Sequence, residues 1–208
     1  MTKQQGYVLI VEDDPDILTL MEASLTFSGY RVATAPNGRE GLDAIQKERP
    51  AVVIADIMMP KLDGFGLIHR LRLDPQTRDI PVVIITATYV APDDKEFVLD
   101  TGATLFIQKP VDIEKFLATM AEIMEQGMPP VIEPLRDFKF YEGYRIRLET
   151  KLDQKFKQIA RFEQLLETAS DAEDHALRAS LRQAINEREE LKLLLHQVHK
   201  RLEKYTKS

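Results

Sequence analysis

Five polar side chains have the types and the spacing that chemistry on a phosphoryl group requires. Each lies just past a short apolar segment: Glu12 and Asp13, Asp56, Thr86 and Lys109 follow residues 6–11, 51–55, 81–85 and 104–107. Carboxylates suit a hard cation such as Mg²⁺, which lowers their mutual repulsion and neutralises charge on an incoming phosphoryl group. Asp56 would then attack as a nucleophile, while Lys109 and Thr86 would contact the phosphoryl oxygens.

The segments that must position these side chains alternate between two types. Short apolar runs rich in β-branched residues are typical of parallel strands that are buried on both faces. They include a further strand at residues 30–35 and alternate with helices expected at about 15–28, from 38 to before Pro50, and at 65–73, 92–101 and 112–126. This order predicts an α/β fold, a doubly wound five-stranded parallel sheet with helices on both faces. The carboxyl ends of its strands would converge on one crevice.

The first helix has recognisable start and stop signals. Pro15 suits its first turn, Asp14 is placed to cap it, and Gly29 would end it. Its expected apolar positions are Ile17, Leu18, Met21, Leu25 and Phe27.

Composition excludes several classes of function. The chain of 208 residues contains no cysteine, so it has no disulfide, no thiolate metal site and no thiol nucleophile. No apolar run reaches the length of a membrane span, and the first residues lack the apolar core of a signal peptide. We therefore expect a cytoplasmic protein without a membrane partner. Residues 1–135 carry 12 basic and 21 acidic side chains, and residues 136–208 carry 16 and 13, which is too small a basic excess to predict nucleic-acid binding.

A composition change divides the chain. Three prolines and a glycine between residues 126 and 134 predict a stiff linker at 127–136, with one domain at 1–126 and another at 137–208. The second domain contains no proline, so we expect an all-α hairpin or coiled coil broken near 168–171. Its second half carries apolar residues at alternating spacings of four and three, interrupted by Arg188, for which Glu163 or Glu167 is the expected acidic partner. The helices could form a hairpin, pair between two chains, or do both as a four-helix bundle.

Several motifs in the first domain occur in a familiar order. They are Val11-Glu-Asp-Asp14, Asp56-Ile-Met-Met-Pro60, Asp63-Gly64, Thr86-Ala87, Gly102-Ala103 and Lys109-Pro110. Over residues 6–126 the chain resembles the receiver domain of two-component response regulators of bacteria and archaea. The resemblance implies a flavodoxin-like receiver that catalyses its own phosphorylation and dephosphorylation.

The resemblance also implies roles for individual residues. Asp56 is the phosphoacceptor, phosphorylated by a cognate histidine kinase. Glu12, Asp13, Asp56 and the carbonyl of Met58 would hold Mg²⁺. Lys109 contacts the phosphoryl group, and the Lys109–Pro110 peptide is expected to be cis. Thr86 and Phe106 form the switch that reports phosphorylation, with residues 90–95 as candidate surface for the response.

The second domain contains no helix-turn-helix with a basic recognition helix and no enzymatic signature. We therefore expect a protein-interaction module that forms a homodimer through its helices, changes conformation or association on phosphorylation, and contacts a downstream protein. The alternative is a phosphorelay intermediate that uses His175, His196 or His199, although exposed helix-surface histidines are the default interpretation. DNA binding by the helical module is a third interpretation, which would show a steep salt dependence.

Overall fold

The computed structural model describes residues 6–87, 91–126, 137–168 and 171–206. The chain divides into two compact units, Met1–Leu135 and Arg136–Ser208. The expected linker at 127–136 lies outside the described residues, as does Val90 of the expected response surface. In the described segments, no helix is long and apolar enough to cross a bilayer.

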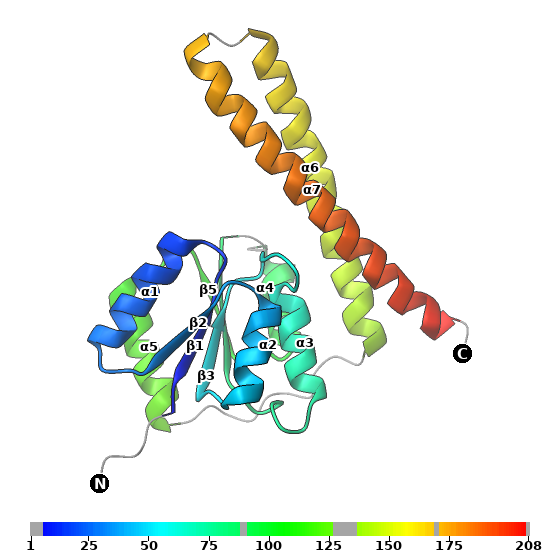
Figure 1. Cartoon of the computed structure of the whole chain (residues 1–208). Coiled ribbons are helices and arrows are strands. Elements are labelled where there is room, and N and C mark those ends of the chain that lie inside the picture. Colours follow the sequence, from blue (N-terminus) through cyan, green and yellow to red (C-terminus); the bar gives the residue numbers. More distant parts are fainter. Residues whose placement is uncertain (1–5, 88–90, 127–136, 169–170, 207–208) are drawn as a thin grey trace. The chain divides into compact units, whose positions relative to one another are not determined.

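The first unit is built on a parallel sheet of five strands in the order β2-β1-β3-β4-β5. The strands are β1 (Val8–Val11), β2 (Val32–Ala35), β3 (Val52–Ala55), β4 (Val82–Thr86) and β5 (Leu105–Gln108). The helices are α1 (Pro15–Phe27), α2 (Gly38–Lys47), α3 (Gly64–Leu73), α4 (Pro92–Asp100) and α5 (Ile113–Gln126). Helices α1 and α5 cover one face of the sheet, and α2, α3 and α4 cover the other (Figure 1). The predicted doubly wound fold is confirmed.

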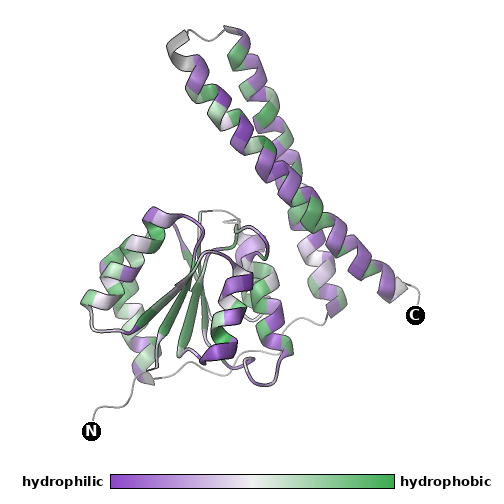
Figure 2. Ribbon diagram, in the orientation of Figure 1, coloured by the Kyte–Doolittle hydropathy of each residue, from purple (hydrophilic) through white to green (hydrophobic). Residues whose placement is uncertain are grey.

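The core of this unit follows from the alternation of side chains along the strands. Every residue of β1, β3 and β4 is buried, and Figure 2 shows these strands as predominantly hydrophobic. Val8 and Ile10 of β1 pack with Ile54 of β3 and with Met21 and Phe116 from α1 and α5. The intervening residues of each strand point to the opposite face, so both faces need covering helices.

Helix α1 begins as predicted, but not all of its apolar residues are buried. The Asp14 side chain accepts hydrogen bonds from the backbone N–H groups of Asp16 and Ile17. Met21 and Leu25 are buried, whereas Phe27 is 95% exposed, so this apolar residue lies outside the core. Two residues advance an α-helix by about 200°, which carries Phe27 away from the face that Leu25 buries.

A buried arginine ties three segments of the first unit together. The Nε and Nη2 atoms of Arg72 donate to the Gly102 carbonyl at 2.9 and 2.6 Å, and Nη1 donates to the Ile80 carbonyl at 3.0 Å. Gly102 has φ +98°, and a Cβ there would lie 2.7 Å from Arg72 Nε. Burial lowers the pKa of Arg72 to about 10. This side chain therefore anchors the end of α3 to the segments before β4 and β5.

The second unit is a hairpin of two long helices, α6 (Asp137–Thr168) and α7 (Asp171–Thr206). The helices run antiparallel, because Tyr205 Oη donates to Asp137 Oδ2 at 2.7 Å while Lys155 pairs with Glu187 nearer the turn. Figure 1 shows them side by side along their length. The break predicted near 168–171 lies between them, and the hairpin is the alternative that the single chain adopts.

The predicted seam of α7 faces α6. Ala184, Leu191 and Val198 are buried in it. The predicted partner of Arg188 was wrong: its Nη2 lies 2.7 Å from Glu189 Oε1 of the same helix, and its guanidinium lies 5.6 Å from the centre of the Phe156 ring. The antiparallel pairing explains this, since Lys155 and Phe156 are the residues of α6 opposite this turn. Glu163 and Glu167 lie closer to the end of α6.

Candidate functional site

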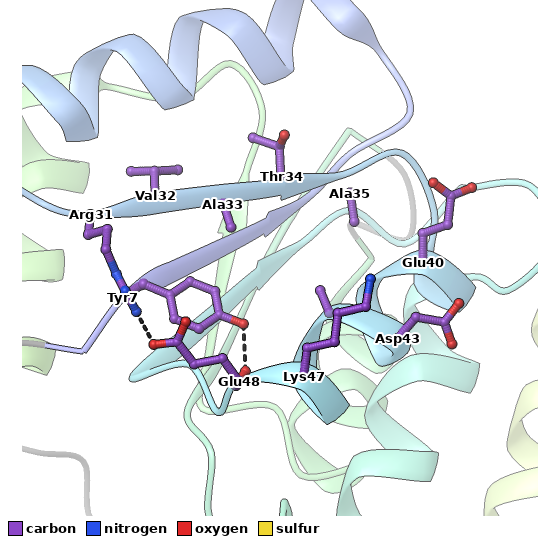
Figure 3. Close-up of a pocket in the computed structure, with 11 residues that line it drawn as sticks. Tyr7, Arg31, Val32, Ala33, Thr34, Ala35, Glu40, Asp43, Lys47 and Glu48 are labelled. Atoms are coloured by element: carbon purple, nitrogen blue, oxygen red, sulfur yellow. Dashed lines mark hydrogen bonds and ion pairs between the residues drawn. The ribbon is translucent and has the colours of Figure 1, made fainter.

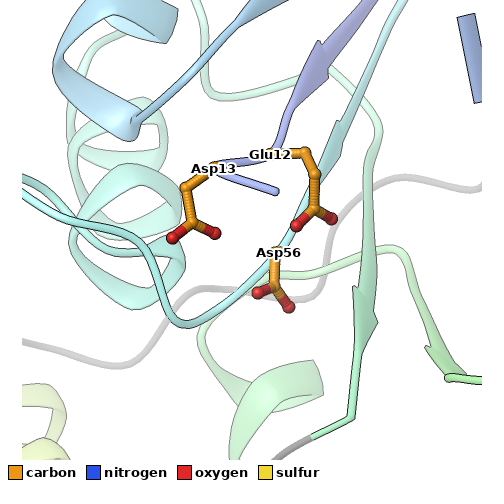
Figure 4. A group of neighbouring side chains, drawn as sticks. All are labelled: Glu12, Asp13 and Asp56. Atoms are coloured by element: carbon orange, nitrogen blue, oxygen red, sulfur yellow. The ribbon is translucent and has the colours of Figure 1, made fainter. Parts of the chain in front are cut away.

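Three carboxylates meet at the carboxyl edge of the sheet. Strands β1 and β3 are neighbours in register, with Val11 opposite Ala55, so Glu12 and Asp56 leave the sheet side by side. The Asp56 N–H donates to the Val11 carbonyl at 3.0 Å and extends this pairing by one residue. One carboxylate oxygen from each of Glu12, Asp13 and Asp56 lies within 4.8 Å of the others (Figure 4).

The other two predicted side chains come from the neighbouring strands. Thr86 ends β4, is fully buried, and hydrogen-bonds the Asp56 carboxylate through its hydroxyl. The Lys109 N–H donates to the Thr86 carbonyl at 2.9 Å, directly after β5. Lys109 Nζ lies 2.8 Å from Glu12 Oε2 and 3.8 Å from Asp56 Oδ1. The Lys109–Pro110 peptide is cis, as the resemblance implied. The fold therefore brings all five residues to one place.

Burial dominates the electrostatics of the site. Loss of solvent raises the pKa of Glu12, of Asp13 and of Asp56 above their ordinary values. The Asp56 carboxylate raises the pKa of both neighbours further, whereas the ammonium of Lys109 lowers the pKa of all three groups. One lysine thus offsets only part of the cost of holding three carboxylates close together.

The site has the features that a divalent cation would need. Asp56 Oδ1 is buried and has no hydrogen-bond partner, and Lys109 Nζ is 3.8 Å away. Three oxygen ligands around such an atom fit a hard cation, which would satisfy Asp56 Oδ1 and reduce the repulsion. Met58 is half-buried, and its backbone N–H hydrogen-bonds the Asp56 carboxylate. The role of the Met58 carbonyl as a metal ligand stays a prediction.

The predicted switch aromatic lies beside α4. Phe106 is half-buried in β5, and Lys95 Nζ of α4 lies 5.6 Å from the centre of its ring. Asp93 and Asp94 belong to the first turn of the same helix. The ring is therefore placed to contact α4, while its part in switching stays a prediction.

A cleft of about 540 Å³ lies elsewhere in this unit, between the edge strand β2 and α2 (Figure 3). Several of its polar groups pair with one another: Arg31 pairs with the Glu48 carboxylate, and the Tyr7 hydroxyl donates to the Glu48 backbone carbonyl at 2.7 Å. Lys47 and Asp43 add both signs of charge to its lining. The cleft lacks the converging carboxylates of the strand-end site.

The histidines of the phosphorelay alternative lie on the surface of α7. His175, His196 and His199 are exposed on α7, as the default interpretation expected. His199 Nε2 lies 3.7 Å from Glu149 Oε1. Among the described residues, the cluster of Glu12, Asp13 and Asp56 is the one group of three potential metal ligands.

Two features of the first unit were not predicted from the sequence. Asn37, which is 2% exposed, caps α2, and the N–H of the following Gly38 donates to the Leu62 carbonyl in the loop after β3. The Asn-Gly pair was the available signal, but it was interpreted only as the start of a helix. The second feature is the buried Arg72, whose carbonyl partners carry no sequence signal.

Similar proteins place this site in context. The uncharacterized transcriptional regulatory protein YkoG of Bacillus subtilis is 36% identical over 149 residues, which are 71% of this chain and 63% of YkoG. The chain thus spans less than two thirds of that relative. The chemotaxis protein CheY4 of Vibrio cholerae has a solved structure that is 33% identical, covers 57% of this chain and 98% of CheY4, and gives a TM-score of 0.54.

A second solved structure bears on the acidic cluster. It is the receiver domain of a sensor histidine kinase of Pseudomonas aeruginosa, solved with a magnesium ion coordinated in its active-site cleft. It is 27% identical, covers 57% of this chain and 96% of that domain, and gives a TM-score of 0.52. The family model for the response regulator receiver domain matches residues 8–121. Because this match covers more than half of the chain, the protein belongs to the response regulator receiver family.

Proposed function

We propose that this protein is a response regulator that accepts a phosphoryl group on Asp56 from a histidine kinase and relays it to its helical hairpin. The observation that carries the proposal is the buried Asp56 Oδ1 atom, which has no hydrogen-bond partner and lies among Glu12, Asp13 and Lys109. A carboxylate oxygen with a free lone pair beside a cation is suited to attack an electrophilic phosphorus.

The residues divide the transfer among them. Glu12, Asp13, Asp56 and the Met58 carbonyl would hold Mg²⁺, which when bound neutralises negative charge on the phosphoryl oxygens. Asp56 forms the new P–O bond as the P–N bond to the kinase histidine breaks, and that nitrogen takes back the electron pair. Lys109, which pairs with Glu12 at 2.8 Å, would turn to a phosphoryl oxygen.

The same contacts can start the response. Thr86 hydrogen-bonds Asp56 and would follow the phosphoryl oxygen once it arrives. Phe106 would fill the space that Thr86 leaves and thereby shift α4, whose Lys95 lies over the Phe106 ring. This is a population shift between two packings, biased by contacts that exist only with the phosphoryl group.

Phosphorylation is tested with a small phosphodonor, acetyl phosphate, in the presence of Mg²⁺. We expect the wild-type protein to gain the mass of one phosphoryl group, and we expect Asp56→Asn or chelated protein to gain none. Asp43→Asn changes an exposed aspartate of α2 and serves as the matched control, which should be modified like the wild type. Modification of Asp56→Asn to the wild-type level would refute the assignment.

We further propose that the hairpin is a protein-interaction module that associates with a second copy or a downstream protein. Apolar side chains remain exposed on it, including Ile146, Phe156 and Leu193, at 49%, 46% and 59%. Light scattering with beryllofluoride, a phosphoryl mimic, should change the mass or shape of the wild type and leave Asp56→Asn unchanged. An identical mass and shape in all samples would exclude phosphorylation-driven association.

Two alternatives make different predictions. A phosphorelay intermediate would pass label from Asp56 to His175, His196 or His199, which are exposed and accessible to a partner. A transcriptional regulator that binds DNA is the second alternative, because YkoG is named as an uncharacterized transcriptional regulatory protein. DNA binding would weaken steeply as salt increases.

A further inference from the structure

The loop between β3 and α3 is held from the side by the first turn of α2. The Gly38 N–H donates to the Leu62 carbonyl at 2.9 Å. A Cβ atom at Gly38 would lie 2.6 Å from that same oxygen, closer than real Cβ contacts come. Glycine is therefore required for α2 to approach the loop this closely, and any larger residue must push the loop or the helix away.

A second contact joins α2 to the same loop. Lys61 has φ +64°, a left-handed conformation that is uncommon for residues other than glycine. Its Nζ lies 2.9 Å from Glu40 Oε1, which also accepts a hydrogen bond from Asn37 Nδ2 at 2.8 Å. The Lys61–Glu40 pair is exposed and worth little alone, but Asn37 is buried and caps the helix. The Lys61 ammonium thus connects the left-handed turn to the capped first turn of α2.

The two ends of the loop are also closed against β3. The Gly64 N–H donates to the Ile57 carbonyl at 2.9 Å, and a Cβ at Gly64 would lie 2.4 Å from the Asp56 carbonyl oxygen. The loop therefore has a fixed base at β3, and α2 supplies its lateral support. Met58 lies in this loop, and its N–H bonds the Asp56 carboxylate.

We propose that Gly38 and Lys61 are positioning residues that hold the Met58 backbone in place for the divalent cation and for Asp56. This inference rests on the proposed function, because it concerns the same cation site. Neither residue touches the reacting atoms. They act through the loop, as outer residues that orient metal ligands do in other proteins.

The first test is the affinity for Mg²⁺ alone, measured by calorimetric titration of the unphosphorylated full chain. We expect Gly38→Ala to weaken binding roughly tenfold, within the range seen when a supporting residue of a metal site is lost. Gly41→Ala is the matched control: it is another buried glycine of α2, where a Cβ would meet the Val11 side chain at 3.1 Å rather than the loop. Gly41→Ala should keep wild-type affinity.

Lys61→Asn is a second variant, and it tests the loop support without introducing a steric clash. Asparagine tolerates the left-handed conformation, so the variant removes the ammonium while preserving the turn. We expect Mg²⁺ affinity to fall about two- to threefold, as suits the loss of an exposed ion pair. With acetyl phosphate, both variants should need more Mg²⁺ for half-maximal phosphorylation yet reach the wild-type rate at saturation.

Each outcome decides something different. Folded Gly38→Ala and Lys61→Asn proteins with wild-type Mg²⁺ affinity would overturn the inference, and so would an equal loss in Gly41→Ala. If Gly38→Ala does not fold, Lys61→Asn and Glu40→Gln decide by the same criterion. If the wild type binds no Mg²⁺, the proposed function itself fails, which is a separate result from a failure of the loop support.

Discussion

The two units of this protein bury their side chains to different depths. In the first unit whole strands are buried, so charged groups can be held away from water in a fixed arrangement at the strand ends. In the hairpin, ion pairs run along the outside of single helices, as between Arg145 and Glu149 or Arg178 and Asp174. A core on both faces of a sheet thus allows charged groups to be buried together in a reactive site. Two packed helices alone leave their charged groups exposed on the surface.

Truncation of apolar side chains should give the largest difference in unfolding free energy between the two units. Ile54→Ala in β3, where Ile54 is 1% exposed, should cost about 3–5 kcal/mol of unfolding free energy because it leaves a cavity. Leu202→Ala in the half-buried seam of α7 should cost about 1 kcal/mol. Urea unfolding measures both, with the exposed Leu193→Ala as a near-neutral control. Equal losses at Ile54 and Leu202 would indicate that a second molecule covers the hairpin in solution.

Mg²⁺ should stabilise the first unit and leave the stability of the hairpin unchanged. At about one hundred times its dissociation constant, a ligand that binds only the native state stabilises it by about 2.7 kcal/mol. Hydrogen exchange should therefore slow in peptides from β1 and β3 and stay unchanged in α6 and α7. Asp13→Asn, which removes a proposed ligand, is the control. Protection of the hairpin that matches the protection of the sheet would contradict this separation.

Arg188→Leu tests the charged interruption of the hairpin seam. Leucine would complete the apolar stripe and forfeit the stacking on Phe156, a contact worth about 0.5–1 kcal/mol. We expect a net gain of about 1 kcal/mol, visible as slower exchange in α7. Arg182→Leu, on the exposed side of α7, should produce no gain. A loss of stability in Arg188→Leu would show that the stacked cation outweighs seam packing.

Lowering the pH should change the stability of the two units in opposite directions. These are the smallest of the expected effects. Without divalent cations, the raised pKa values of Glu12, Asp13 and Asp56 mean that the folded state binds protons more tightly, so their contribution to stability grows as the pH falls through those values. The pKa values of Asp174 and Glu189 are lowered by their basic partners, so their contribution is present above the ordinary values of 3.8 and 4.5 and is lost below them.

Exchange rates corrected for their intrinsic pH dependence and compared between about pH 7 and pH 3 measure both trends. Asp174→Asn should flatten the response of the hairpin, and Asp56→Asn should flatten that of the sheet. Parallel trends in the two units would refute the contrast.

The sequence predicted most of the first unit because its signals are local. Apolar runs of strand length end at polar residues, and parallel strands bring such ends together, so Glu12, Asp56 and Lys109 can be grouped from the sequence alone. Helix starts were equally local, as the cap at Asp14 shows. The roles of these residues in phosphoryl transfer stay predictions.

What the sequence missed depends on contacts between distant segments. The carbonyl that Gly38 approaches belongs to Leu62, and the carbonyls that hold Arg72 belong to Ile80 and Gly102, so no spacing rule points to them. Arg188 was assigned the wrong partner for the same reason, because the pairing of α6 with α7 selects its neighbours. Local chemistry was predictable, and long-range alignment was not.

The bond between Tyr205 and Asp137 has a consequence for protein engineering. These side chains lie in the last and first turns of the hairpin, 68 residues apart in sequence, and Phe138 packs edge-on against the Tyr205 ring. A module whose two attachment points are adjacent can be grafted into an exposed surface loop of a host protein without spreading that loop. Residues 137–206 are therefore a candidate portable arm, whose far end lies where α6 ends and α7 begins.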